Sequence, residues 1–270
     1  MEHAVLLDVA RSAVALGCKL LSTSEPGAVQ AKGDRDFVTE LDILIQATVR
    51  THLADETPEI GFLGEEAQPG GLEDRVPDLC WVLDPIDGTS NFIHGLPFCA
   101  VSLALVRDGT PVIGVVGAPF LALEYYAAEG GGAFVNGRPI RHRGTGALSR
   151  AIVSIGDYGV GAEAAAKNRV RLAVTAGLAD QVERVRMFGS AALDLVWVAE
   201  GRIDACVLLT NKPWDTAAGV LIARESGAVV TDSNGAPHSL TAAHTIAAAP
   251  LISAALLELV QQAADCVEQA

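Results

Sequence analysis

The pattern of apolar residues limits the fold of this chain more than any other feature. After Pro58, four short apolar runs are typical of strands, at residues 60–63, 80–83, 101–106 and 112–116. The last two are joined by Asp108-Gly109, which favours a tight hairpin turn and antiparallel pairing. From about residue 150, strand-like runs alternate with helical segments, as in a wound α/β fold. The sequence therefore predicts two halves: residues 1–148 with a mostly antiparallel sheet, and residues 149–270 with α/β order.

Helices are predicted at both ends of the chain. Apolar residues recur at helical spacing over the first twenty residues and again over residues 252–267. A polar loop at residues 31–36 leads to Thr39, which is a suitable N-cap for a second helix reaching Leu53. We expect these helices to cover the sheets.

The composition excludes several classes of protein. Of the 270 residues, 50% are hydrophobic and 19% are charged, which excludes a disordered chain. The net charge of −14 argues against a nucleic-acid partner, because such proteins need basic surfaces to contact phosphates. The apolar stretches are shorter than the ~18 to 20 residues of a membrane span, and the N-terminus lacks the features of a signal peptide. We therefore expect a protein of the cytoplasm with no membrane partner.

The five cysteines are scattered and contain no CxxC pair: Cys18, Cys80, Cys99, Cys206 and Cys266. This spacing argues against disulfides and against a thiolate zinc site. We expect the cysteines to act as small apolar core residues.

The segment Asp84-Pro85-Ile86-Asp87-Gly88-Thr89 is the most informative motif for chemistry. Its two carboxylates stand three residues apart at the end of a predicted strand, where α/β proteins often place their functional groups. The Gly-Thr pair that follows suits a tight turn with exposed backbone amides, which can bind a phosphate. By itself, such a motif is also compatible with an ordinary acidic turn.

Other carboxylates occur at comparable positions. Glu65 and Glu66 end another strand-like run, and Asp215 opens a helix just after a strand. Alone, these would be surface charges and a favourable helix N-terminal acid. Together with Asp84 and Asp87 they suggest an oxygen-only site, which favours Mg²⁺ over zinc.

These motifs, in this order, resemble the inositol monophosphatase family of Mg²⁺-dependent, Li⁺-sensitive phosphatases. The likeness rests on Glu65-Glu66, on Trp81 to Phe92, on Trp214 to Gly219, and on the loop from Lys32 to Thr39 with Asp42 after it. It extends from the first helix to the last. It implies the layered αβαβα sandwich of the inositol monophosphatase and fructose-1,6-bisphosphatase type, an α/β fold.

The resemblance also implies roles for single residues. Glu65, Asp84 and the carbonyl of Ile86 would hold one Mg²⁺, while Asp84, Asp87 and Asp215 would hold a second. A third, weaker ion would share Glu65, so two or three ions are expected. The attacking water would be oriented and helped to lose its proton by Thr89 and Asp42.

Further residues are expected to bind the substrate or support the site. The substrate contacts implied by the resemblance are Asp87, Gly88, Thr89, Ser90, Gly189, Ser190 and Ala191. Lys32 is expected on a loop near the metals, and Glu66 behind the ligands. The family likeness also implies a homodimer.

One position departs from the family pattern. Several animal members carry a glutamate that binds a substrate hydroxyl seven positions before the helix-opening aspartate, and here that position is Leu208. We predict a phosphomonoesterase for a small polyol phosphate, with inositol 1-phosphate first. The alternatives are fructose 1,6-bisphosphate, a nucleotide 3′-phosphate, histidinol phosphate, another cyclitol phosphate, or a regulatory binding module without activity.

Overall fold

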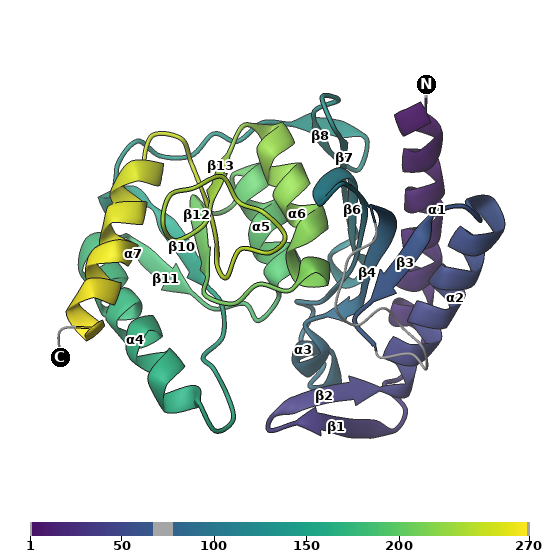
Figure 1. Ribbon diagram of the computed structural model, residues 1–270, viewed down its shortest axis with the longest axis horizontal. Coiled ribbons are helices and arrows are strands. Elements are labelled where there is room, and N and C mark those ends of the chain that lie inside the picture. The colour runs from purple at the N-terminus through teal and green to yellow at the C-terminus, as the bar shows by residue number, and fades with distance from the viewer. Residues whose placement is uncertain (1, 67–77, 269–270) are drawn as a thin grey trace.

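A seven-stranded sheet forms the centre of the first half of the molecule (Figure 1). The structure is a computed structural model that describes residues 2–66 and 78–268. Its strands, in spatial order, are β3 (Gly61–Gly64), β4 (Leu79–Asp87), β5 (Ala100–Arg107), β6 (Thr110–Ala118), β7 (Leu123–Ala128), β8 (Ala133–Val135) and β9 (Arg138–Ile140). Only β3 and β4 pair in parallel, and all other neighbours are antiparallel. The predicted turn at Asp108-Gly109 joins β5 to β6, and both residues have positive φ as a tight hairpin turn requires.

Helices cover both faces of this sheet. The helices α1 (Glu2–Thr23) and α2 (Glu40–Glu56) lie on one face, and α5 (Ala191–Glu200) and α6 (Pro213–Ser226) lie on the other. The strands β4, β5 and β6 are buried along nearly their whole length because helices cover them from both sides. This burial accounts for their nearly continuous apolar sequence.

A five-stranded sheet forms the second half. Its order is β11 (Arg184–Arg186), β10 (Ile152–Ile155), β12 (Ala205–Leu208), β14 (Thr245–Ala248) and β13 (Val229–Thr231). The neighbours β11, β10 and β12 are parallel, whereas β14 is antiparallel to both β12 and β13. The helices α4 (Ala164–Gln181) and α7 (Ser253–Glu268) lie on its outer face, and α5 and α6 lie between the two sheets (Figure 1). The predicted αβαβα layering is confirmed.

The N-terminal region differs in one respect from the sequence prediction. Thr39 caps α2 as expected, with a capping box to Asp42. The polar segment 31–36, expected as a loop, instead forms most of a hairpin of β1 (Val29–Gly33) and β2 (Asp36–Thr39). All five residues of β1 are exposed, so this strand has none of the apolar alternation by which a strand is predicted. The remaining short elements are α3 (Thr89–Ile93), η1 (Pro119–Leu121) and η2 (Leu148–Arg150).

The cysteines are all free thiols, as predicted, but not all are core residues. Cys80, Cys99 and Cys206 are buried, whereas Cys18 is half-buried and Cys266 is exposed on the last helix. Within residues 2–66 and 78–268, no helix has both the length and the apolar character needed to cross a membrane.

Candidate active site

The end of β4 carries two of the predicted carboxylates. Asp84 and Asp87 are 2% and 7% exposed, and Ile86 between them is also buried. The pairing of β4 with β5 shifts register between the two aspartates, so the backbone leaves the regular sheet there. The amide of Ile86 donates to Oδ1 of Asp84 over 3.0 Å. The predicted motif is therefore a buried, irregular strand end.

The turn after β4 needs a glycine. Gly88 has a φ of +89°, and a Cβ there would lie 2.7 Å from the carbonyl oxygen of Phe98. Gly88 is also the N-cap of α3, so the free amides of the first helical turn follow it directly. The hydroxyl of Thr89 lies 2.9 Å from the Ile86 carbonyl oxygen and 3.2 Å from Oδ1 of Asp42.

Asp42 is held in place by the start of its own helix. Its Oδ2 accepts hydrogen bonds from the backbone amide and the hydroxyl of Thr39, which leaves Oδ1 to face Thr89. Burial raises the pKa of Asp42, although the bonds from Thr39 oppose this. The side chain therefore accepts a proton more readily than an ordinary aspartate.

Glu65 and Glu66 follow β3 and are linked to the β1–β2 hairpin by one lysine. The Nζ of Lys32 lies 2.7 Å from Oε1 of Glu65 and 3.0 Å from Oε1 of Glu66. The backbone of Glu66 is fixed by Gln46, whose side-chain amide bonds to both its N–H and its carbonyl group. Gln46 is a buried polar residue of α2, and the sequence analysis did not identify it. Its polar character among the regularly spaced apolar residues of this helix was the available signal.

Asp87 also contacts the second half of the molecule. It accepts hydrogen bonds from the hydroxyl of Ser190 and from the amides of Ala191 and Ala192, at 3.2 and 2.8 Å for the amides. These groups form the N-terminus of α5, which favours a negative charge. Two of the predicted substrate contacts, Ser190 and Ala191, thus lie against a predicted metal ligand.

Asp215 joins the cluster from the first turn of α6. Burial raises the pKa of Asp84 well above its usual value, and the carboxylates of Glu65, Asp87 and Asp215 raise it further. Burial likewise raises the pKa of Asp215, with Asp87 and Glu65 contributing. Burial raises the pKa of Asp87 to about 6, in spite of its three hydrogen bonds. Four carboxylates, two of them on β4, are therefore close enough to repel one another.

This arrangement fits divalent cations of the Mg²⁺ type. All the converging ligands are oxygen atoms, and a cation would remove the mutual repulsion that raises the pKa values. In the described part of the chain, no three acidic, histidine or cysteine side chains are already arranged as a closed metal-binding group. Glu65 instead lies against Lys32, and Asp87 lies against the start of α5. Binding of an ion would exchange these protein donors for the ion.

The predicted substrate contacts Gly189, Ser190 and Ala191 follow the strand β11 and lead into α5. Gly189, with a φ of +71°, follows β11 and precedes the α5 N-terminus. Its position is fixed by Asn91, whose amide nitrogen lies 2.7 Å from the carbonyl oxygen of Phe188 and 3.3 Å from that of Gly189. Asn91 lies within the motif from Trp81 to Phe92, but the sequence alone does not indicate this role. Ser90, beside it on α3, is exposed.

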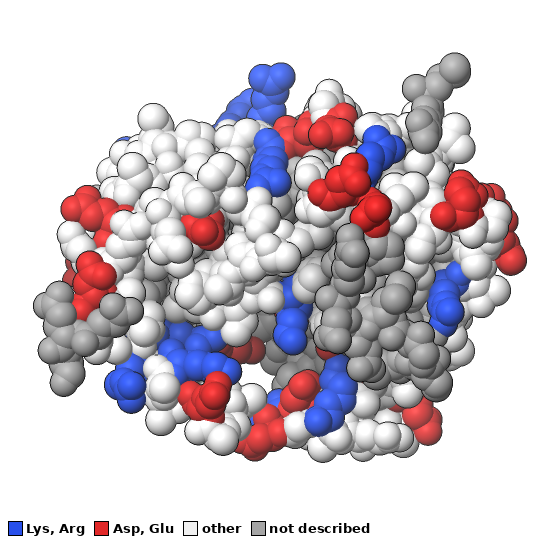
Figure 2. Space-filling view, in the orientation of Figure 1, with Lys and Arg blue, Asp and Glu red and all other residues white. Residues whose placement is uncertain are grey.

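Leu208 at the end of β12 and Lys212 in the loop after it differ in burial. Leu208, the position that departs from the family pattern, is 3% exposed and packs into the core between the sheets. Lys212 is exposed near Asp215, with its Nζ 5.7 Å from the centre of the Trp214 ring. Figure 2 shows a hollow above the β1–β2 hairpin, with basic and acidic side chains around it.

Comparison with known proteins agrees with this geometry. Residues 3–266 match the inositol monophosphatase family. The chain belongs to this family. It is 38% identical over 234 residues to the inositol-1-monophosphatase ImpA of Mycolicibacterium smegmatis, with 87% of this chain and 83% of the relative covered. It is 37% identical over 267 residues to an inositol-1-monophosphatase of Rhizobium meliloti, with 97% and 98% covered.

A solved structure described as a Thermotoga maritima IMPase has the same fold. The TM-score is 0.87 at 32% sequence identity, and the match covers 97% of this chain and 98% of that one. The family membership and the fold predicted from the motifs are both confirmed.

Proposed function

We propose that this protein is a Mg²⁺-dependent phosphomonoesterase that hydrolyses inositol 1-phosphate to myo-inositol and phosphate. The observation that carries the proposal is the convergence of four carboxylates, Glu65 after β3, Asp84 and Asp87 on β4, and Asp215 on α6, beside the free amides at the start of α3. An acidic cluster alone would repel a phosphate ester, so a bound cation is required for this substrate class. The names of the relatives support the same substrate.

Mg²⁺ would be held by Glu65, Asp84, Asp87, Asp215 and the carbonyl of Ile86, as two or three ions. Bound there, it would neutralise phosphoryl oxygens, make water more acidic and stabilise the leaving alkoxide. Glu66, whose carboxylate faces Lys32, would support this ligand set from behind.

The chain's own residues supply orientation and a path for the proton. The amides of Gly88 and Thr89 would bind phosphate oxygens. The hydroxyl of Thr89 would accept a proton from the attacking water and pass its own proton to Asp42, with which it already shares a hydrogen bond. The water oxygen then forms a bond to phosphorus, the bond from phosphorus to the polyol oxygen breaks, and that oxygen takes a proton from solvent. The raised pKa of Asp42 favours this acceptance of a proton.

Leu208, at the end of β12, bears on the choice among the alternative substrates. Leu208 offers no hydrogen bond to a substrate hydroxyl, which supports a broader specificity than that of a strict inositol enzyme. Fructose 1,6-bisphosphate, a nucleotide 3′-phosphate, histidinol phosphate and other cyclitol phosphates are therefore the competing substrates. The family likeness further supports inhibition by Li⁺ and a homodimer, which sedimentation would test.

Phosphate release from this set of esters tests the proposal. We expect turnover that requires Mg²⁺, stops with EDTA and falls with Li⁺, with inositol 1-phosphate giving the highest kcat/KM. A higher kcat/KM for another ester would replace the substrate and retain the chemistry. Turnover of none of them would favour a regulatory binding module, a role that the intact carboxylate cluster argues against.

A further inference from the structure

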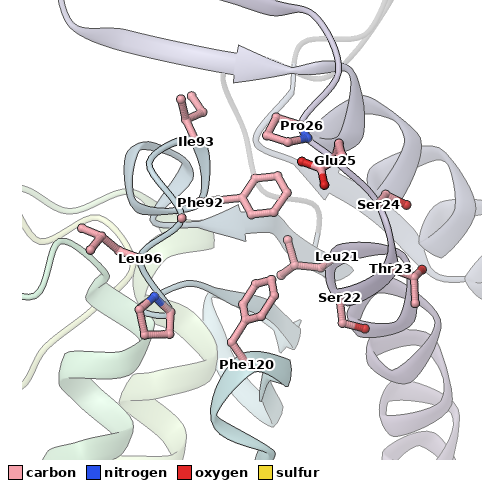
Figure 3. A pocket seen from close by; sticks show the side chains of 12 residues that line it. Leu21, Ser22, Thr23, Ser24, Glu25, Pro26, Phe92, Ile93, Leu96 and Phe120 are labelled. Carbon is pink, nitrogen blue, oxygen red and sulfur yellow. The ribbon is translucent and has the colours of Figure 1, made fainter.

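A cavity of about 390 Å³ lies beside α3, and the proposed chemistry uses none of the residues that line it. It lies between the C-terminal end of α1, the C-terminal part of α3 with the residues after it, and η1 (Figure 3). Its lining residues are Leu21, Ser22, Thr23, Ser24, Glu25, Pro26, Phe92, Ile93, Gly95, Leu96, Pro97 and Phe120. Its volume lies within the range of small-molecule sites, about 300 to 1,000 Å³.

One part of the cavity is apolar and aromatic. The rings of Phe92 and Phe120 stack with their centres 6.3 Å apart, and Leu21 is fully buried beside them. Phe120 and Leu96 are 44% and 48% exposed, so large apolar side chains here remain in contact with water. An apolar ring or a short branched chain would cover this surface.

The polar part of the cavity favours a positive charge. Glu25 is exposed, and within residues 2–66 and 78–268 it forms no ion pair. Figure 3 shows its carboxylate turned toward the ring of Phe92. None of the twelve lining residues is basic. The 22-residue helix α1 ends at this place with no basic residue in its last turn, and its C-terminus adds a partial negative charge. The faces of phenyl rings also attract cations.

We propose that this cavity binds a small organic ammonium ion with an aromatic or branched alkyl body. The ammonium group would lie between the Glu25 carboxylate and the face of Phe92, and the body would lie against Phe120. A polyol phosphate does not fit this description, because it is anionic and lacks an apolar body. The site is therefore separate from the substrate site, and it lies on the helix that begins at Thr89.

Binding of 2-phenylethylammonium tests the proposal, with the neutral 2-phenylethanol and the anionic 3-phenylpropanoate as matched probes. Calorimetry would be done at saturating Mg²⁺, so that the acidic active site does not take up the organic cation. We expect the ammonium ion to bind most tightly and the carboxylate least. Glu25→Gln should weaken ammonium binding roughly threefold and leave the alcohol unchanged, as expected for an exposed ion pair.

Phe120→Ala should weaken both the ammonium ion and the alcohol by at least about fivefold, because it removes the aromatic wall. Phe120 lies on an exposed 3-10 turn, so this change does not open the core. Glu59→Gln removes an exposed carboxylate outside the cavity and should have no effect on either ligand. Equal affinity of the wild type for the ammonium ion and the alcohol would overturn the proposal. So would ammonium binding that both Glu25→Gln and Phe120→Ala leave intact.

Discussion

The carboxylate cluster and the loops after β11 and β12 are built differently. Asp84 and Asp87 lie on a strand that is covered from both sides, and their oxygens are fixed by several hydrogen bonds. The loops after β11 and β12 instead expose Met187, Thr210 and Lys212 to water. A buried frame fixes the position of its groups, whereas exposed loop side chains vary without disturbing the core. We propose that the frame determines the chemistry and that the loops determine the choice of substrate.

The largest effect is expected from a change inside the frame. Asp84→Asn removes a charge shared by both proposed ions, so kcat/KM should fall by at least about a thousandfold, since metal stabilisation contributes several kcal/mol. The fold should be retained, because burial already disfavours the charged form of this side chain. Steady-state kinetics and thermal unfolding would measure both quantities. Asp108→Asn, in the exposed β5–β6 turn, is the matched control. Near-wild-type turnover by Asp84→Asn would show that the buried frame does not determine the chemistry.

A smaller effect is expected at the start of α3. Thr89→Ala removes the proposed proton path to Asp42 and should lower kcat by about a hundredfold with little change in KM. Thr89→Ser keeps the hydroxyl and should restore most of the activity. If serine were as inactive as alanine, the methyl group rather than the hydroxyl would be the important feature, and the proposed path would be wrong.

A change on the loop side should affect binding rather than chemistry. Lys212→Met removes an exposed positive charge near Asp215, so KM should rise roughly three- to fivefold while kcat stays within about twofold. The effect should shrink as salt concentration increases, since exposed charges are screened. Lys19→Met on α1 serves as the control. A large fall in kcat at unchanged KM would instead place Lys212 in the chemical step and remove the distinction between the two regions.

The smallest expected effect is on the stability of the metal-free protein. The pKa of Asp87 is about 6 in the folded chain, against about 3.9 for an unfolded aspartate, so the folded state binds the proton more tightly. This contribution to stability is fully present below about pH 4 and is lost as the pH rises through about 6. In EDTA, the Tm should therefore be a few degrees higher at pH 5.5 than at pH 7.5.

Mg²⁺ should reverse this dependence, because it favours the charged carboxylates. Differential scanning calorimetry at the two pH values, with and without Mg²⁺, would measure it. The Asp87→Asn variant should show a smaller difference in EDTA. An unchanged difference in that variant would show that Asp87 is not responsible.

The sequence was sufficient to predict the frame but not its supports. Asp84 and Asp87 could be identified because they end a strongly apolar strand, and Thr39 because it precedes a helical pattern. The hairpin that carries Lys32 was missed because its strand β1 is exposed and has no apolar alternation. Pairing of Lys32 with both Glu65 and Glu66 depends on tertiary structure, which local patterns do not report.

The amide residues show the same limit. Gln46 and Asn91 each bond to the backbone of a distant segment, and nothing in their own sequence neighbourhood indicates the partner. Asp215 could be recognised as the start of a helix, but its approach to the other carboxylates depends on how α6 packs between the sheets. The positions of these acids at the ends of elements suggested the association, and the family resemblance assigned it to a common site.

Anomalous diffraction from a crystal grown with Mn²⁺ in place of Mg²⁺ would locate the bound cations. We predict a manganese peak in contact with an Asp84 oxygen and with an oxygen of at least one further carboxylate among Glu65, Asp87 and Asp215. Manganese found only elsewhere, with Glu65 still bound to Lys32 and Asp87 still bound to the start of α5, would contradict it.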